Sequence, residues 1–160
     1  MAESLFLDRT DLRLLALLQQ DGRATNTDIA AQVSLSPSAC LRRIQRLEAA
    51  GIIRGYAALV DPKAVGLGLQ AFVRVQLEKH GQAGLDPFIE GVNNWDEVVA
   101  CHALTGDMDY LLHVVVQDLE HFSQFLLDKL INATGVADVN SSFVLRTVKQ
   151  TRALPLGHLA

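Results

Sequence analysis

Hydrophobic and polar positions follow two different periods along the 160-residue chain. In the first sixty residues the apolar side chains recur three and four positions apart, which is typical of helices packed against a core. This spacing predicts a first helix over residues 11–20 with Asp8 as its N-cap. It also predicts a short second helix that is capped by Asn26 or Thr27.

The third predicted helix begins at Ser36-Pro37, which combines a hydroxyl cap with a proline at the first helical position, and it ends at Gly51. Its predicted buried side carries Cys40, Ile44 and Leu47. The opposite side carries Ser38, Ala39, Arg42, Arg43 and Arg46. Small residues let the backbone approach a groove of DNA, and arginines reach phosphates and guanine edges.

Two helices joined by a turn as short as Ser34-Leu35, the second with a basic face, predict a helix-turn-helix that binds double-stranded DNA. Residues 52–56 predict a short strand that would form a wing. The residues expected at the DNA are Asn26, Thr27, Ser36, Ser38, Ala39, Arg42, Arg43 and Arg46. The alternative is an ordinary three-helix bundle in which the arginines form only a solvated face.

Beyond Val60 the pattern changes to an alternation of strands and helices in the order βαββαβ. Strands are predicted at residues 69–78, 98–105, 110–116 and 139–148, and helices begin near Leu85 and Leu119. This order predicts an α+β, ferredoxin-like domain with both helices on one face of an antiparallel sheet. The other face carries apolar residues and no cover, so we expect it to pack against a second copy of the chain.

The expected organisation is a winged helix-turn-helix over residues 1–60, a hinge over 61–68 and a second domain over 69–160. Although the net charge is −4, residues 1–60 carry seven arginines and six acids and are net +1, whereas the remainder is net −5. A local basic spot can hold phosphates on an acidic body, because salt screens distant charge beyond about 10 Å.

Composition narrows the class of protein further. A hydrophobic content of 49% supports a buried core and excludes disorder as the main state. No apolar run approaches the roughly 20 residues of a membrane span, and the first residues lack a secretory pattern. Cys40 and Cys101 lack zinc-site spacing. We therefore expect a cytoplasmic protein that contacts no membrane and carries neither metal nor cofactor.

Three motifs stand in a fixed order along the chain. They are Leu7-Asp8-Arg9-Thr10-Asp11, then Ser34-Leu35-Ser36-Pro37-Ser38 running on to Gly51-Ile52-Ile53-Arg54-Gly55-Tyr56, then Gly106-Asp107-Met108-Asp109-Tyr110-Leu111-Leu112. Together they resemble the leucine-responsive regulatory protein (Lrp)/AsnC family of bacterial and archaeal transcription regulators. The resemblance implies an N-terminal winged helix-turn-helix and a C-terminal RAM domain that binds an amino acid or a related metabolite.

The same resemblance implies homodimers that pair through their sheets and assemble into tetramers or octamers, with the effector in clefts between dimers. In this chain the amides near Gly106 would take a ligand carboxylate, and Asp107 or Asp109 its ammonium. From spacing alone, the same residues are more typical of a solvated hairpin turn. The implied effector site comprises Ala103, Leu104, Thr105, Gly106, Asp107, Asp109, Leu119, Ser142 and Phe143. Ala39 stands where many members have proline, and Ser142 where some carry a bulky aromatic residue.

Two other functions stay open on the residues alone. An enzyme on a dimeric sheet could use Asp107, Asp109, His102 and His113 as acid and base, but no nucleophile–base pair accompanies them, so we expect no enzyme. Zinc would need a third ligand beside the two histidines. An architectural DNA-binding protein without an effector is the other alternative. The favoured function is a transcription regulator whose DNA affinity is linked to amino-acid binding.

Overall fold

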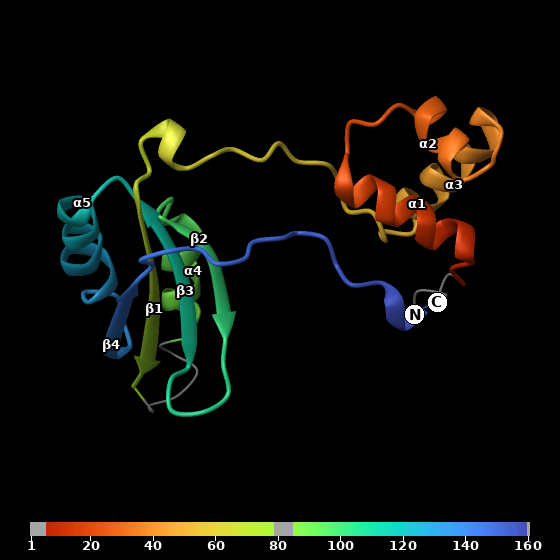
Figure 1. The fold of residues 1–160 in the computed structure, drawn as a ribbon. Coiled ribbons are helices and arrows are strands. Elements are labelled where there is room, and N and C mark those ends of the chain that lie inside the picture. Colours follow the sequence, from red (N-terminus) through yellow and green to blue (C-terminus); the bar gives the residue numbers. More distant parts are fainter. Residues whose placement is uncertain (1–5, 79–84, 160) are drawn as a thin grey trace. The chain divides into compact units, whose positions relative to one another are not determined.

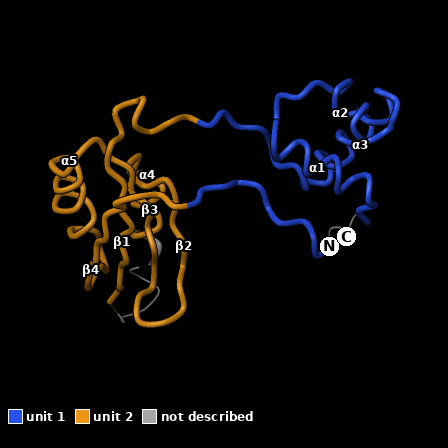
Figure 2. The backbone as a smooth tube through the Cα atoms, in the orientation of Figure 1, with its two compact units in different colours: residues 1–59, 149–160 blue, residues 60–148 orange. Residues whose placement is uncertain are grey.

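The computed structural model describes residues 6–78 and 85–159. By its contacts the chain divides into two compact units (Figure 2): unit 1 comprises residues 1–59 and 149–160, and unit 2 comprises residues 60–148. The last twelve residues therefore group with the N-terminal unit, whereas the boundary drawn from the sequence had assigned them to the second domain.

Unit 1 is built on three helices, α1 (Arg9–Gln20), α2 (Asn26–Gln32) and α3 (Pro37–Ala49) (Figure 1). Asp8 caps α1 as predicted: its carboxylate accepts from the Asp11 amide, and the Asp11 carboxylate accepts from the Asp8 amide. Ser36 caps α3, with Pro37 at the first helical position. The core that these helices enclose consists of Leu14, Ile29, Ala30, Val33, Cys40 and Ile44.

The cap of α2 is Thr25, so the expectation of Asn26 or Thr27 was wrong by one or two positions. The Thr25 hydroxyl accepts from the Asp28 amide at 3.2 Å. The turn into α3 places Ser34 in the left-handed region at φ 57°, and the Leu35 amide donates to the Ala30 carbonyl at 2.9 Å. This tight turn sets α3 against α2 as a helix-turn-helix requires.

The strand predicted over residues 52–56 does not form. The segment turns after α3 and then runs without a ladder partner among the described residues. Tyr56 ties it to the helices instead, because its hydroxyl donates to Glu48 at 3.0 Å and its ring lies close to Gly22. Burial and then the Glu48 carboxylate raise the pKa of Tyr56 to about 12.

The C-terminal segment attaches to α1 through one side chain. The Gln19 amide oxygen accepts from the Leu154 backbone amide at 2.5 Å, and the Gln19 amide nitrogen donates to the Leu154 carbonyl at 3.4 Å. A short 3₁₀ turn, Gly157–Leu159, follows. Both backbone groups of Leu154 are satisfied by this side chain, as they would be by a neighbouring strand.

Unit 2 contains a four-stranded antiparallel sheet in the spatial order β2-β3-β1-β4. Its strands are β1 (Leu69–Leu77), β2 (Val98–Ala103), β3 (Tyr110–Val116) and β4 (Val136–Phe143). The predicted βαββαβ order is confirmed, but β4 begins and ends earlier than expected. The Val144 amide makes the last bond to β1, at Gln70, and by continuation of this register residues 146–148 lie beyond the start of β1.

Both helices of unit 2 cover the same face of the sheet (Figure 1). They are α4 (Leu85–Asn94) and α5 (Leu119–Gln124), which continues as a π-helical turn, Phe125–Leu130. The core between helices and sheet consists of Ala71, Val73, Val75, Phe88, Val92, Leu112, Val114, Val116, Phe122, Phe125 and Leu130. Leu119, the first residue of α5 after the Asp118 cap, is 59% exposed.

Neither unit contains a described helix that is long and apolar enough to cross a membrane.

Candidate functional site

The exposed polar face of α3 contains fewer arginines than the sequence predicted. At about 100° per residue, Ser38, Gln45 and Arg42 lie within about 60° of one another, and Arg46 and Arg43 are rotated a further ~40° and ~100°. Ser38, Arg42 and Gln45 are all exposed. None of the ion pairs formed by the described residues involves Arg42. This sector of α3 therefore offers one unpaired cation beside polar groups that can donate and accept hydrogen bonds.

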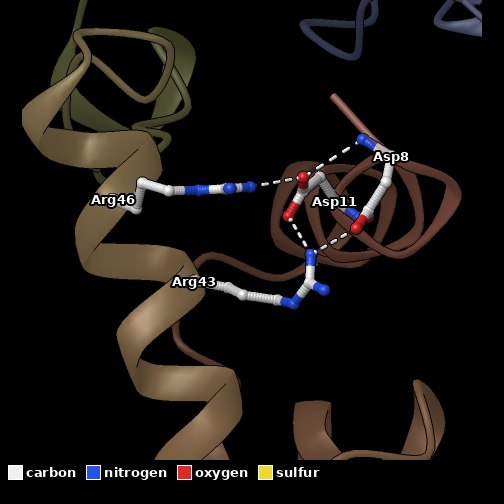
Figure 3. Close-up of polar contacts among 4 residues, drawn as sticks. All are labelled: Asp8, Asp11, Arg43 and Arg46. Atoms are coloured by element: carbon white, nitrogen blue, oxygen red, sulfur yellow. Dashed lines mark hydrogen bonds and ion pairs between the residues drawn. The ribbon is translucent and has the colours of Figure 1, made fainter. Parts of the chain in front are cut away.

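Arg43 and Arg46 turn toward α1 rather than away from the protein (Figure 3). Arg43 Nη1 lies 2.7 Å from Asp8 Oδ2 and 2.9 Å from Asp11 Oδ1, and Arg46 Nη2 lies 2.5 Å from Asp11 Oδ2. The Asp11 carboxylate is fully buried. The expectation that all three arginines face away from the rest of the unit was wrong. Arg43 and Arg46, which lie nearer the buried side of α3 than Arg42 does, bind carboxylates at the start of α1.

The hydrogen bonds and ion pairs among Asp8, Asp11, Arg43 and Arg46 shift the pKa values of Asp8 and Arg43. The hydrogen bond from the Asp11 amide and the Arg43 guanidinium hold the pKa of Asp8 below its ordinary value. The same contacts, from Asp8 and then Asp11, raise the pKa of Arg43. A buried carboxylate such as Asp11 is tolerated because three donors satisfy it: Arg43, Arg46 and the Asp8 amide.

The remaining residues of the predicted DNA set lie near the start of α3. Asn26 Nδ2 donates to the Pro37 carbonyl at 2.7 Å, so this side chain ties α2 to the first turn of α3. Thr27 and Ser38 are exposed, and Ala39 is half-buried. Ser36 Oγ accepts from the Ala39 amide and lies 3.2 Å from Ser38 Oγ. Asn26 and Ser36 thus have structural partners already.

Two residues that shape the exposed surface of α3, Gln45 and Asp11, were not identified from the sequence. Gln45 lies in the exposed sector of α3, and its position at i+3 from Arg42 could have indicated this. Asp11 appeared only as part of a motif, although an acid placed inside an apolar helix stripe signals a buried partner.

The uncovered face of the sheet in unit 2 carries a shallow pocket of about 560 Å³. It is lined by Phe72, Arg74, Leu104, Leu111 and Ser142. Phe72 is 42% exposed, and its ring stacks on His113 with centroids 4.8 Å apart. His113 Nε2 lies 3.2 Å from Gln70 Oε1, and burial lowers the pKa of His113. An apolar face with one arginine in a pocket is suited to association or to an anionic group.

The nine residues expected at the effector site do not meet in one chain. Leu104 and Ser142 line the pocket on the uncovered face. Phe143 pairs with buried Ala71 and packs edge-on against Phe122, so it faces the helices. Alternation along β4 forces this separation, because adjacent residues of a strand point to opposite faces. By the same register Ala103 lies on the helix side, opposite Tyr110, and Leu119 lies on α5.

Hydrogen bonds between Asp109 and β1 hold the turn between β2 and β3 in place. Asp109 Oδ2 accepts from the Leu77 amide at 2.7 Å, and the Asp109 backbone amide donates to Val75 at 2.9 Å. Asp109 therefore anchors the turn to β1 and is less available to a ligand than expected. Gly106 adopts φ +114°, which only glycine takes without strain. Thr105, Gly106 and Asp107 are exposed.

His102 and His113 both lie on the uncovered face, opposite Leu111 and Ala100 respectively. Among the described residues no group of three or more His, Cys, Asp or Glu side chains could hold a metal ion.

Comparison with known proteins assigns both units. A model described as winged helix-turn-helix DNA-binding matches residues 7–54, and one described as the Lrp/AsnC ligand binding domain matches residues 70–154. The chain belongs to the Lrp/AsnC family of transcription regulators. It therefore has a DNA-binding winged helix-turn-helix in unit 1, with α3 as the recognition helix, and a ligand-binding domain in unit 2.

Individual relatives cover almost the full length of the chain. It is 34% identical to the transcriptional regulator AzlB of Bacillus subtilis, over 97% of this chain and 99% of that protein. It is 38% identical to the glutamate uptake regulatory protein of Zymomonas mobilis, over 94% and 91%. The crystal structure of the transcriptional regulator NMB0573/L-Met complex from Neisseria meningitidis matches with a TM-score of 0.94 and 50% identity, over 96% and 99%.

Proposed function

We propose that this Lrp/AsnC regulator reads DNA through the exposed sector of α3, acts as a homodimer, and changes its DNA affinity when an amino acid binds to unit 2. The observation that carries the proposal is the geometry of α3. Its N-terminus is fixed by Ser36 and by the Asn26–Pro37 hydrogen bond, and Ser38, Arg42 and Gln45 point outward from it. An anchored helix with an exposed polar side can enter a major groove.

The exposed side chains suit different parts of DNA. Arg42 matches the two acceptors of guanine or a phosphate, and Gln45 matches the donor and acceptor of adenine. Ser38 and the half-buried Ala39 leave room for the backbone of α3 to approach the bases. Thr27, exposed on α2, can donate to a phosphate oxygen.

The homodimer would form through the uncovered sheet face. Phe72, Leu104 and Leu111 surround Arg74 there, and covering the first two would remove exposed apolar area from water. A two-fold axis through this face would bring the same pocket of each copy together. A single sedimenting species of monomer mass at micromolar concentration would contradict this arrangement.

The effector site would lie at the β2–β3 turn and be completed by other copies of the chain. The exposed Asp107 can accept a ligand ammonium, and amides near Gly106 a carboxylate. Tetramers or octamers of dimers would supply walls that this chain does not bring to the turn by itself. L-Met is the first effector to test, because a solved relative at 50% identity is a complex with it.

The DNA proposal is tested by fluorescence anisotropy on the duplex upstream of the gene against a scrambled duplex. Wild type should favour the upstream duplex, and Arg42→Ala should lose at least about 1 kcal/mol of that preference if Arg42 reads a base. Arg146→Ala removes the same charge from an exposed site in unit 2 and should leave the preference unchanged. Equal binding to both duplexes would refute sequence-specific recognition.

The effector proposal is tested by adding L-Met, and then other amino acids, to the same assay. Linkage predicts a 5- to 150-fold change in DNA affinity, about 1–3 kcal/mol. A ligand at 100 times its dissociation constant should also stabilise unit 2 by about 2.7 kcal/mol in thermal unfolding. Asp107→Ala should abolish both effects. Tight, specific DNA binding that no amino acid alters would instead support an architectural DNA-binding protein.

A further inference from the structure

Four side chains form a closed ionic cluster between the first turn of α1 and the recognition helix (Figure 3). Asp8 and Asp11 contribute two negative charges, and Arg43 and Arg46 contribute two positive ones. A single guanidinium nitrogen, Arg43 Nη1, bridges both carboxylates. The cluster is therefore neutral as a whole, and both arginines are already paired before DNA arrives.

The geometry of the pairing resembles that of arginine on phosphate. A carboxylate and a phosphate both offer anionic oxygens to guanidinium donors, and the two distances from Arg43 are those of charge-assisted hydrogen bonds. Arg43 and Arg46 are three positions apart on α3, so they leave the helix on the same side. Arg42, rotated by about 100° from Arg43 on the helix, makes no ion pair with a described residue.

We infer that Asp8 and Asp11 are internal substitutes for phosphate, which keep Arg43 and Arg46 off the DNA backbone and fix the rotation of α3. This inference rests on the proposed function, since it assumes that α3 contacts DNA. Phosphate contacts supply most of the sequence-independent affinity of a DNA-binding protein. By neutralising two of the three arginines within α3, the cluster lowers non-specific binding and leaves Arg42 to act at the DNA. Asp8 and Asp11 are thus positioning and specificity-determining residues.

The salt dependence of binding to a scrambled duplex measures how many positively charged side chains of the protein displace counterions from DNA phosphates. Each phosphate contact contributes a slope of about 0.9 to log K against log [salt]. Four variants of the full chain are compared with wild type: Arg42→Gln, Asp8→Asn, Asp8→Asn with Arg43→Gln, and Arg146→Gln. Asparagine caps helices as well as aspartate does, so Asp8→Asn keeps the start of α1 while it removes one charge.

The inference predicts a distinct result for each variant. Arg42→Gln should lower the slope by about 0.9. Asp8→Asn should raise the slope by up to about 0.9, so that the ratio of its affinities for the scrambled duplex at 50 mM and 200 mM salt is up to about 3.5-fold larger than the same ratio for wild type. The double variant should return to the wild-type slope, because it removes a pair that DNA does not use. Arg146→Gln, in unit 2, should have no effect.

Two outcomes would overturn the inference while the proposed function stands. One is a double variant whose slope falls as far as that of Arg42→Gln, since Arg43 would then contact phosphate in the wild type. The other is Asp8→Asn binding the scrambled duplex no more tightly than wild type. Failure of the wild type to bind any duplex would instead refute the proposed function. Thermal unfolding of each variant establishes that it is folded, and Asp11 is left intact for that reason.

Discussion

Among the described residues, each unit buries one acidic side chain, and the two carboxylates have different partners. Asp11 in unit 1 is fully buried and accepts from two arginines of the recognition helix. Glu97 in unit 2 is 9% exposed and accepts from Lys129 at 2.7 and 3.0 Å, with His121 Nε2 3.5 Å away. Burial alone would raise the pKa of Glu97, but the hydrogen bond from Lys129 contributes to a pKa below the ordinary value.

The surroundings of these carboxylates explain the contrast. Among the described residues, unit 2 has a core cluster of eleven buried members, and the partly buried Trp95 makes edge contacts with two of them, Phe88 and Phe125. The core cluster of unit 1 has six members among the described residues, three of them Ala, Val or Cys, and Leu12, Leu15 and Leu47 are buried as well. Because a core of small side chains buries less apolar area, we expect the ionic cluster to contribute a larger share of the stability of unit 1. We expect unit 1 to respond to changes of charge and unit 2 to changes of packing.

The largest expected effect is the loss of an aromatic side chain from unit 2. Phe88 is fully buried, and Phe88→Ala should reduce the free energy of unfolding of unit 2 by about 3–5 kcal/mol. Calorimetry should then resolve two transitions, of which only that of unit 2 has moved. If both units lost stability together, they would form one cooperative body and the contrast would fail.

A smaller effect is expected when the charge cluster of unit 1 is broken. Asp11→Ala removes a satisfied buried carboxylate, but Arg43 and Arg46 are part-exposed and can turn to water, so the cost should be about 1–3 kcal/mol. Arg42→Ala, on the same recognition helix but without a partner carboxylate, should stay within about 0.5 kcal/mol. Urea unfolding of both variants measures the difference. Equal losses would mean that the cluster adds nothing to unit 1.

The smallest expected effect is on the pH dependence of unit 2. Burial lowers the pKa of His113, so the unfolded chain takes up a proton before the folded chain does. The stability that His113 contributes is complete above pH ~6.5 and declines as the pH falls toward the folded pKa. Thermal unfolding between pH 7.5 and 5.5 should show a larger loss for wild type than for His113→Gln. Identical curves would show that His113 does not sense pH.

Local rules were enough to predict most of the fold. Capping residues Asp8 and Ser36 marked the starts of α1 and α3, because side-chain caps act within a single turn. Period-two alternation placed β1, β2 and β3 and separated the buried from the uncovered face of the sheet. Two boundaries were predicted wrongly: Thr25 caps α2, and β4 ends at Phe143, near the start of β1, rather than at residue 148.

The sites were harder to predict because they depend on contacts between distant segments. A helical projection placed Arg43 and Arg46 on the polar side of α3, but only the fold brings Asp8 and Asp11 to meet them. In the same way, Ser142 and Phe143 are neighbours in sequence and lie on opposite faces of the sheet. The residues of the β2–β3 turn are local and were found together, whereas Phe72, Arg74 and Leu111 joined the pocket only through strand pairing.

Because residues 149–160 group with unit 1, unit 2 is an insertion within the sequence of unit 1. Its two ends, Val60 and Val148, are both continued by chain that belongs to unit 1. A protease that cut the first connection would leave the three helices attached to the rest only through non-covalent contacts such as the Gln19–Leu154 pair. Unit 2 is therefore joined to unit 1 by two covalent connections rather than one.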